Sequence, residues 1–496
     1  MKPLARILTA LLSLIGLTLV PFTAVAQDEP IFDDPEGSFS LPVPTNWTAA
    51  AQDGYVVLTD PDALIKVYAL VVPGNDVSAA ITAAWAIVQP DFTFAPIQDQ
   101  EVPSSQGVEL SRVLTQVNDD QTQVYQAVGQ LVDGQVYILL FDADVVAATQ
   151  RGAQINIIAT GFTINAITQT DLTGMTALPI DAALLAELEA YINEILVTLE
   201  VPGASVAIVR DGEVVYTQGF GVRELGGTDP VTPDTLMMIG STTKSFTTLL
   251  MAILVDEGVI TWDTPVVDIL PSFALQDPEV TQQITVRNLV CACSGVPRRD
   301  LEWVFNTNTA EGIIESLAEY ALFTDFGEAF QYSNQMVASG GYIAALAAGG
   351  AYGDLEQAYL EVMQVRVFDP LGMTDATFSF DTVAASADYA LPHGATLLGE
   401  YVPSPLALES VLTQVAPAGS LWSSANDMAR YLITQLNRGV TPEGERIVSA
   451  ENLELTWEPQ VSVSSETSYG LGWLVEDYDG LQLIHHGGNT FGFTSD

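Results

Sequence analysis

One lysine inside an apolar segment constrains the fold of this chain more than any other feature. Lys244 stands three residues after Ser241, in a stretch with many hydrophobic side chains, although the chain has only two other lysines, Lys2 and Lys66. Residues three apart share one face of a helix. The pattern predicts a helix over residues 241–255, with Gly258 just past its end. Such a helix brings the Ser241 hydroxyl and the Lys244 amine into contact.

This pair of side chains is typical of nucleophilic catalysis by serine. The N-terminus of a helix offers free backbone N–H groups and a partial positive charge, and both favour an oxyanion forming at an acyl group on Ser241. Lys244 can take the serine proton only when its amine is neutral, and burial lowers the pKa of a lysine in the required direction. The alternative is a helix-capping serine beside a surface lysine, which the scarcity of lysine makes less attractive.

Two further motifs contain suitable partners. Tyr332 and Asn334 precede a predicted helix over residues 335–348. A tyrosine hydroxyl can relay a proton, and an asparagine amide can hold both a lysine and a substrate carbonyl. His486 is followed by two glycines on a late predicted strand, where a substrate backbone can lie along the edge. Each motif alone is common, and packing, capping or ordinary strand residues would explain it.

Together, in this order and spacing, the three motifs resemble those of the serine β-lactamases and penicillin-recognising hydrolases. The similarity is strongest to the branch with class C β-lactamases, D-aminopeptidases, DD-peptidases and related esterases. It implies an α/β fold: a β-lactamase-like domain over residues 180–496, with an antiparallel sheet flanked by helices plus an all-helical region. Relatives continue beyond the third motif, so we expect this domain to be truncated at its C-terminus. Further matching stretches are residues 288–297, 368–373, 416–429, 469–473 and 489–493.

The resemblance also implies a role for each site residue. Ser241 would be the acylated nucleophile, Lys244 its base, and Tyr332 the group that shuttles the proton to and from the leaving group. The backbone N–H groups of Ser241 and Asn489 would form the oxyanion hole. His486 stands where many family members have lysine, so it would hold a substrate carboxylate less firmly. The expected substrate-binding residues are Asn334, His486, Gly487, Gly488 and Asn489.

The chain before this domain divides into three parts. Residues 1–26 have a basic start, a short apolar run and an Ala-Val-Ala cleavage site, which predicts a signal peptide and a secreted or cell-envelope protein. Residues 28–165 alternate predicted strands with helices over residues 77–88 and 144–159, and join two strands at Asp133-Gly134. This small α/β domain resembles the PsbP/Mog1 type and is interpreted as a binding or spacer module. Residues 166–179 read as a linker. A capped helix over residues 181–199 and a hairpin over residues 205–219 follow, and we expect the hairpin to share one sheet with the late strands.

Composition excludes several functions. The net charge of −47 argues against nucleic acid and anionic lipid as partners, because phosphates would be repelled. Three histidines and two cysteines without ligand spacing predict no metal site, and we expect no cofactor. Cys291 and Cys293 are expected to be buried free thiols, because a bridge across one residue of extended chain would be strained. A redox pair is the minor alternative.

The sequence therefore predicts an exported serine hydrolase that works through an acyl-enzyme on Ser241. Its substrate would be a D-amino-acid peptide, a β-lactam or a carboxylic ester. The alternative is a non-catalytic protein that binds cell-wall peptide on the same scaffold.

Overall fold

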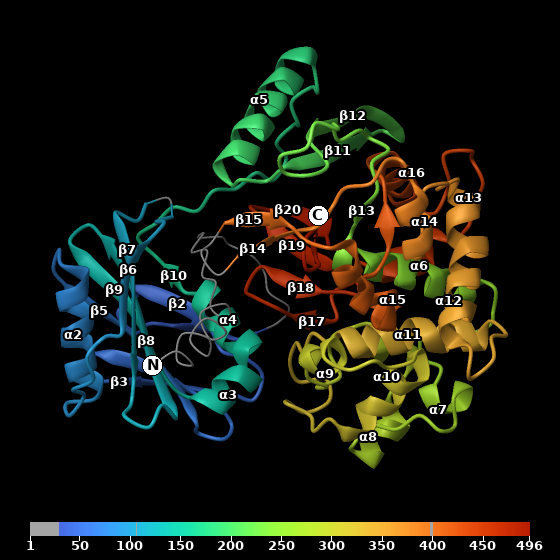
Figure 1. Ribbon diagram of the computed structural model, residues 1–496. Coiled ribbons are helices and arrows are strands. Elements are labelled where there is room, and N and C mark those ends of the chain that lie inside the picture. Colours follow the sequence, from blue (N-terminus) through green and yellow to red (C-terminus); the bar gives the residue numbers. More distant parts are fainter. Residues whose placement is uncertain (1–28, 106, 397–399) are drawn as a thin grey trace.

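The computed structural model describes residues 29–105, 107–396 and 400–496, so the predicted signal peptide lies outside the described residues. The chain forms two units that pack against each other (Figure 1). The N-terminal unit, residues 29–164, has its own hydrophobic clusters. The main core of the second unit draws its residues from positions 236 to 473. The structure is a mixed α/β protein.

A seven-stranded antiparallel sheet forms the body of the N-terminal unit, in the order β3-β4-β5-β9-β8-β7-β6. Side chains alternate between its faces. Ile65 and Val67 belong to the cluster under α3 (Val145–Gln150) and α4 (Gly152–Thr160), whereas Tyr68 and Leu70 face α2 (Val77–Val88). The strands are β3 (Thr48–Gln52), β4 (Tyr55–Thr59), β5 (Ile65–Pro73), β6 (Gln98–Val102), β7 (Leu110–Val117), β8 (Gln123–Val132) and β9 (Gln135–Asp144).

The local predictions for this unit hold with one difference. Helix α2 and the Asp133-Gly134 turn between β8 and β9 lie where the sequence places them. The single helix predicted over residues 144–159 is two helices, because the chain bends at Arg151 between α3 and α4. A smaller sheet of β1 (Ile31–Asp33), β2 (Phe39–Pro42) and β10 (Thr163–Ile164) brings the two ends of the unit together.

Helix α5 (Ala182–Thr198) and the hairpin of β11 (Gly203–Arg210) and β12 (Glu213–Gly221) lie at the top of Figure 1. Asp181 caps α5 by accepting hydrogen bonds from the backbone N–H groups of Ala183 and Leu184, as expected of an N-cap aspartate. All side chains of α5 are exposed or half-buried. The helix and the hairpin were both predicted from their sequence patterns.

Helix α6 (Thr243–Asp256) lies at the centre of the second unit, with every residue from Thr243 to Leu254 buried. It packs against α11 (Asn334–Ala347), α15 (Ala416–Gly419) and α17 (Ala450–Leu455). Around them lie α7 (Val266–Ile269), α8 (Pro278–Gln283), α9 (Asp300–Val304), α10 (Ala310–Ser316), α12 (Leu355–Met363), α13 (Asp369–Leu371), α14 (Phe380–Ala385) and α16 (Ala425–Leu436). The helix lies where the sequence predicts it, and its polar side chains are buried together with its apolar ones.

The late strands form an antiparallel sheet of β17 (Val461–Ser462), β18 (Thr467–Tyr469), β19 (Leu474–Tyr478) and β20 (Leu481–His485). The prediction that the β11–β12 hairpin belongs to the same sheet is wrong: within the described ranges, β11 and β12 pair only with each other. A cavity of about 690 Å³, lined by Gly203 of β11 and Ile484 of β20 among others, lies between them. Short pairs complete the unit: β13 (Met237–Met238) with β16 (Trp422–Ser423), β14 (His393–Ala395) with β15 (Tyr401–Pro403), and β21 (Gly488–Asn489) with β22 (Thr494–Ser495).

The two cysteines form a disulfide, so the prediction of free thiols is wrong. That prediction assumed an extended chain. Instead, Ala292 has a φ of 53°, and this left-handed residue folds the chain until the Cα atoms of Cys291 and Cys293 are 5.2 Å apart. This separation lies within the usual range for a disulfide.

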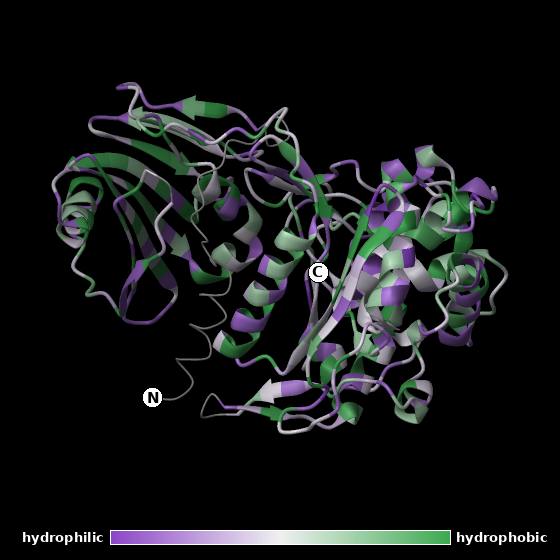
Figure 2. Ribbon diagram, turned by 90° about the horizontal axis from the view of Figure 1, so that it is seen from above, coloured by the Kyte–Doolittle hydropathy of each residue, from purple (hydrophilic) through white to green (hydrophobic). Residues whose placement is uncertain are grey.

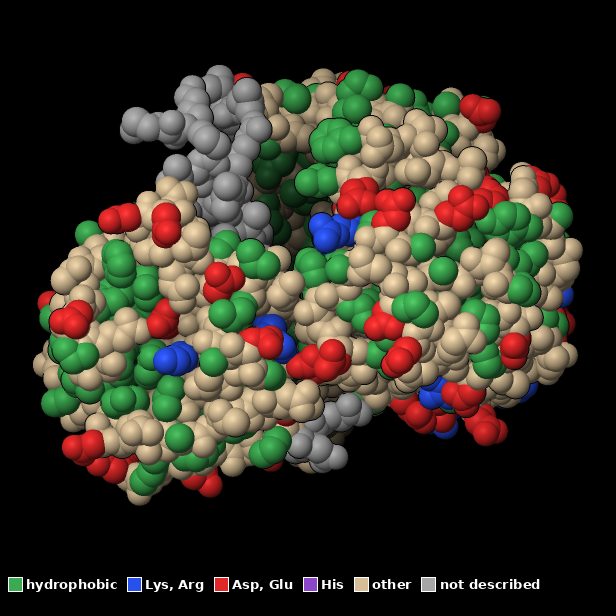
Figure 3. All heavy atoms as spheres, turned by 90° about the horizontal axis from the view of Figure 1, so that it is seen from below, with side chains coloured by type: hydrophobic (Ala, Val, Ile, Leu, Met, Phe, Trp, Pro, Cys, Tyr) green, Lys and Arg blue, Asp and Glu red, His purple; other side chains and the backbone are tan. Residues whose placement is uncertain are grey.

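Hydrophobic residues are concentrated in the strands of the large sheet (Figure 2), and acidic side chains outnumber basic ones on the face seen in Figure 3. Within the described ranges, every helix is too short or too polar to cross a membrane. The His, Cys, Asp and Glu side chains of those same ranges form no cluster of three suited to a metal ion.

Candidate active site

The turn before α6 presents Ser241 at the surface of the second unit. Gly240 has a φ of 51°, which lets the chain turn sharply from β13 into the short 3₁₀ helix Gly240–Thr242. Ser241 is half-buried at this point, while Lys244, one turn later, is fully buried. The predicted pair therefore meets at the start of the helix, with the serine half-buried and the lysine enclosed.

The Lys244 amine has three close oxygen neighbours. Its Nζ donates to Oδ1 of Asn334 at 2.8 Å and to the carbonyl oxygen of Ala418 at 2.6 Å, and lies 2.9 Å from Oγ of Ser241. Burial, and then the positive charge of Arg298, hold the pKa of Lys244 well below its ordinary value. A neutral amine has two N–H groups and one lone pair. When the amine is neutral and gives both N–H groups to Asn334 and Ala418, its lone pair is left for the hydroxyl of Ser241.

Asn334 is held in turn by an aspartate. Its Nδ2 lies 3.0 Å and 3.2 Å from the two carboxylate oxygens of Asp300. Because Asp300 takes the amide N–H groups, the Asn334 carbonyl must point towards Lys244. Asn334 therefore orients the lysine, while its amide nitrogen is committed within the protein.

Tyr332 completes the group around Ser241. Removal of water from its hydroxyl raises the pKa of Tyr332, although a hydrogen bond with Ser241 and the charge of Arg298 act in the opposite direction. Its ring centroid lies 4.8 Å from Nζ of Lys244. A tyrosine with a raised pKa keeps its proton at neutral pH. It can therefore pass a proton on, but it is a poor base in the resting site.

His486 is buried and uncharged. Its Nδ1 donates a hydrogen bond to the carbonyl oxygen of Gly487 at 2.8 Å. In the neutral ring, Nε2 therefore has no proton and accepts a hydrogen bond from the hydroxyl of Tyr469 at 3.1 Å. Burial is the main cause that lowers the pKa of His486, to about 3. Both ring nitrogens are occupied within the protein, and the ring has no positive charge to offer a substrate carboxylate.

The glycines after His486 let β21 lie directly against the serine turn. A methyl group on Gly488 would be 1.9 Å from the carbonyl oxygen of Ile239 and 2.9 Å from the backbone nitrogen of Ser241. A methyl group on Gly240 would be 2.7 Å from the backbone nitrogen of Asn489. The two backbone nitrogens expected to form the oxyanion hole therefore belong to segments in close contact.

The structure brings together Ser241, Lys244, Tyr332, Asn334 and the segment 486–489. Sequence reasoning missed three partners: Asp300, the Ala418 carbonyl and Tyr469. Ala418 lies in a stretch already matched to the family, and Tyr469 begins another. Asp300 follows two arginines in an acidic chain, a local pattern that could have drawn attention to it.

Comparison with known proteins agrees with this geometry. The family model described as Beta-lactamase matches residues 188–495. The chain belongs to the Beta-lactamase family. The resemblance of residues 28–165 to PsbP/Mog1-type domains stays a prediction.

Two curated relatives illustrate the breadth of this family. Unguisins hydrolase ungD' from Aspergillus campestris is 30% identical over 309 residues, which cover 59% of this chain and 55% of the relative. Penicillin-binding protein 4 from Amycolatopsis lactamdurans is 28% identical over 304 residues, covering 59% of this chain and 76% of the relative. The chain thus spans about half of the length of the first relative and three quarters of the second.

A solved structure gives the same family assignment. The octameric penicillin-binding protein homologue from Pyrococcus abyssi matches with a TM-score of 0.51 and 29% identity, over 62% of this chain and 68% of that chain. The β-lactamase-like fold predicted from the motifs is therefore confirmed.

Proposed function

We propose that this protein is an exported serine hydrolase that acts through an acyl-enzyme on Ser241. One observation carries the proposal: Nζ of the buried Lys244 lies 2.9 Å from Oγ of Ser241 and also contacts Oδ1 of Asn334 and the carbonyl oxygen of Ala418. These two acceptors take both N–H groups of a neutral amine, so its lone pair would be free to accept the serine proton. The distance of 2.9 Å is within reach for proton transfer. The family to which the chain belongs, and its hydrolase relatives, support the same reading.

The reaction follows from these contacts. As Oγ of Ser241 attacks the substrate carbonyl, its proton passes to Nζ of Lys244, and the oxyanion is stabilised by the backbone N–H groups of Ser241 and Asn489. Tyr332 then gives its proton to the leaving group and receives the proton held by Lys244. This transfer leaves Lys244 neutral again, with the acyl group on Ser241. For release of the acyl group, water attacks its carbonyl and gives a proton to Tyr332, which passes its own proton to Lys244. Lys244 then returns a proton to Oγ of Ser241 as the acyl bond breaks.

The substrate is an ester or amide: a carboxylic ester, a D-amino-acid peptide or a β-lactam. A neutral His486 in place of lysine favours substrates that do not depend on a cation at this position for binding a carboxylate. We therefore place esters and peptides ahead of β-lactams.

Covalent labelling tests the proposal. A fluorescent fluorophosphonate, and separately a fluorescent penicillin, should label the parent protein and a Ser245→Ala variant but leave Ser241→Ala unlabelled. Ser245 is a matched control, because it is a buried serine on the same helix whose hydroxyl bonds to the backbone of Thr242. Labelling of Ser241→Ala at the parental rate would refute the proposal. Tight binding of a cell-wall peptide without any covalent adduct by mass spectrometry would instead favour the non-catalytic alternative.

A further inference from the structure

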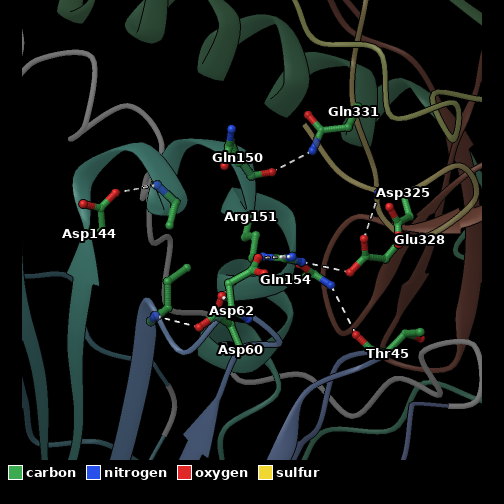
Figure 4. A network of polar contacts seen from close by, with 12 residues as sticks. Thr45, Asp60, Asp62, Asp144, Gln150, Arg151, Gln154, Asp325, Glu328 and Gln331 are labelled. Atoms are coloured by element: carbon green, nitrogen blue, oxygen red, sulfur yellow. Dashed lines mark hydrogen bonds and ion pairs between the residues drawn. The ribbon is translucent and has the colours of Figure 1, made fainter. Parts of the chain in front are cut away.

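The N-terminal unit makes direct polar contacts with residues 325–331, the segment that precedes Tyr332. Arg151, at the bend between α3 and α4, extends across the boundary between the two units (Figure 4). Its guanidinium lies 2.8 Å from Oε1 of Glu328, and also contacts Asp62 at 2.9 Å and Asp60 at 3.4 Å. Glu328 lies four residues before Tyr332.

Three of the four side chains in this ion-pair cluster are buried, and only Asp62 is exposed. The side chains of Asp60, Glu328 and Arg151 are only 0%, 5% and 10% exposed. Burial alone would raise the pKa of Glu328, but hydrogen bonds from Arg151 and from the backbone N–H of Asp325 hold it below its ordinary value. Breaking a buried pair leaves an uncompensated charge, so such clusters fix the geometry of the groups that they join. The Glu328 carboxylate also accepts from the backbone of Asp325 at 2.9 Å, which ties the turn itself to Arg151.

A second contact involves Gln331, the residue directly before Tyr332. Nε2 of Gln331 donates to the backbone carbonyl of Gln150 at 2.7 Å, and Gln331 directly precedes Tyr332 (Figure 4). On the opposite side, the backbone N–H of Gln331 donates to the carbonyl of Ala292 at 2.7 Å. The residue before Tyr332 is therefore held between the N-terminal unit and the disulfide turn of the second unit.

Helix α4 makes a third attachment, to the turn between β17 and β18. Nδ2 of Asn156 donates to the carbonyl of Val463 at 3.0 Å, and the hydroxyl of Thr160 accepts from the backbone N–H of Ser465 at 3.0 Å. Strand β18 then ends at Tyr469, whose ring lies 6.1 Å from that of Tyr332 in an edge-on contact. The N-terminal unit thus contacts two segments of the second unit, and each is followed in the chain by a side chain of the candidate active site: Tyr332 in one case and Tyr469 in the other.

We propose that the N-terminal unit positions Tyr332 for proton transfer to the leaving group, and that Arg151 and Gln331 are positioning residues. This goes beyond a binding or spacer module, and it rests on the proposed function because it assigns the general-acid step to Tyr332. A shift of the segment 325–331 would displace the phenol while leaving the contacts of Lys244 with Asn334 and Ala418 intact. Attack by Ser241 would then continue, and proton delivery would fail.

Leaving-group dependence tests this assignment in the full chain. A p-nitrophenolate leaves readily without a proton, whereas an alkoxide requires one. We would compare kcat/KM for p-nitrophenyl butyrate and ethyl butyrate in Arg151→Met, Gln331→Ala and the parent. General acid catalysis contributes about 10²- to 10⁴-fold, so partial misplacement should lower the ethyl ester rate at least about tenfold more than the aryl ester rate. Arg112→Gln is the matched control, because Arg112 pairs with Asp99 within the N-terminal unit.

The outcomes are distinguishable. Equal losses for both esters in Gln331→Ala, with unchanged thermal stability, would overturn the inference. Arg151→Met could fail to fold because it leaves Asp60 buried without its partner, and Gln331→Ala then decides alone. If Arg151 and Gln331 both position the Tyr332 phenol, their effects should not add. The ratio of kcat/KM for the aryl ester to kcat/KM for the ethyl ester in the double variant should then nearly equal that in the more impaired single variant. Full activity of Ser241→Ala would reject the proposed function itself, whereas an inactive Ser241→Ala with equal ester losses rejects only the role of the N-terminal unit.

Discussion

Replacement of Gly488 by alanine should disable the site through a single methyl group. The added Cβ would lie 1.9 Å from the carbonyl oxygen of Ile239, whereas real Cβ atoms essentially never come closer than 3.0 Å. The Cβ would also lie 2.6 Å from Oγ of Ser495, but the closest atom, the Ile239 carbonyl oxygen, belongs to the backbone. β21 would therefore have to move away from the serine turn by about 1 Å, the shortfall from 3.0 Å. A misplacement of about 1 Å can lower the rate about 10²-fold. The neighbouring Asn489 N–H would move with the strand.

We therefore expect kcat/KM for p-nitrophenyl butyrate to fall about 10²-fold in Gly488→Ala, which corresponds to about 2.7 kcal/mol of transition-state stabilisation. This agrees with the usual cost of losing one oxyanion-hole donor, about 10²- to 10³-fold. Initial rates over a range of substrate concentrations, with circular dichroism and thermal melting of each variant, are sufficient measurements.

The adjacent glycine offers a matched control. A methyl group on Gly487 would find its nearest neighbours at 3.6 Å, in Asp496 and Ser495, which is ordinary contact. Neither glycine has the positive φ that would strain an alanine. Gly487→Ala should stay within about threefold of the parent. The reasoning is refuted if Gly488→Ala keeps parental kcat/KM, or if both variants lose activity equally.

Three further predictions concern the pKa of Lys244, with one variant each at Arg298 and Asp300, and the pKa of Glu466. Because Lys244 must be neutral to act as the base, kcat/KM should rise as pH rises through the pKa of Lys244. After burial, the positive charge of Arg298 is the next cause that lowers this pKa. Arg298→Gln should therefore raise the pKa of Lys244 and move the acidic limb of the pH–rate profile to higher pH. Asp300 raises the same pKa, so Asp300→Asn should move that limb to lower pH while reducing kcat, because Asn334 loses its anchor. A shift in the same direction for both variants would contradict the assignment of Lys244 as base. Burial, and then the charges of Glu476, Asp477 and Asp479, raise the pKa of Glu466 to about 8. The folded protein therefore holds the carboxyl proton of Glu466 more tightly than the unfolded chain does. The contribution of Glu466 to the free energy of unfolding falls as pH rises from about 4.5 to about 8. Glu466→Gln should melt at a higher temperature than the parent at pH 8 and at the same temperature near pH 4.5; an equal difference at both pH values would count against the shift.

Local patterns in the sequence were sufficient for much of the fold. The apolar spacing of α2, the Asp133-Gly134 turn and the capping aspartate of α5 depend on residues close together in the chain, and each was predicted correctly. The serine–lysine pair belongs to the same class, since its geometry follows from one helical turn.

Features that depend on distant segments could not be predicted in this way. Asp300 and the Ala418 carbonyl reach Asn334 and Lys244 only through tertiary packing, so no local spacing points to their roles. The disulfide depends on the backbone of Ala292, which carries no sequence signal for a left-handed turn. The ion pairs of Arg151 likewise join it to carboxylates from two other parts of the chain.

The scarcity of lysine makes the protonation state of the site directly observable. A protein labelled with nitrogen-15 at lysine side chains would contain only Lys2, Lys66 and Lys244. Lys66 is exposed, whereas Lys244 is enclosed beside Ser241. Nitrogen chemical shifts differ between an amine and an ammonium, so a magnetic resonance titration can follow the protonation of the Lys244 amine itself, without substrate and with almost no spectral overlap.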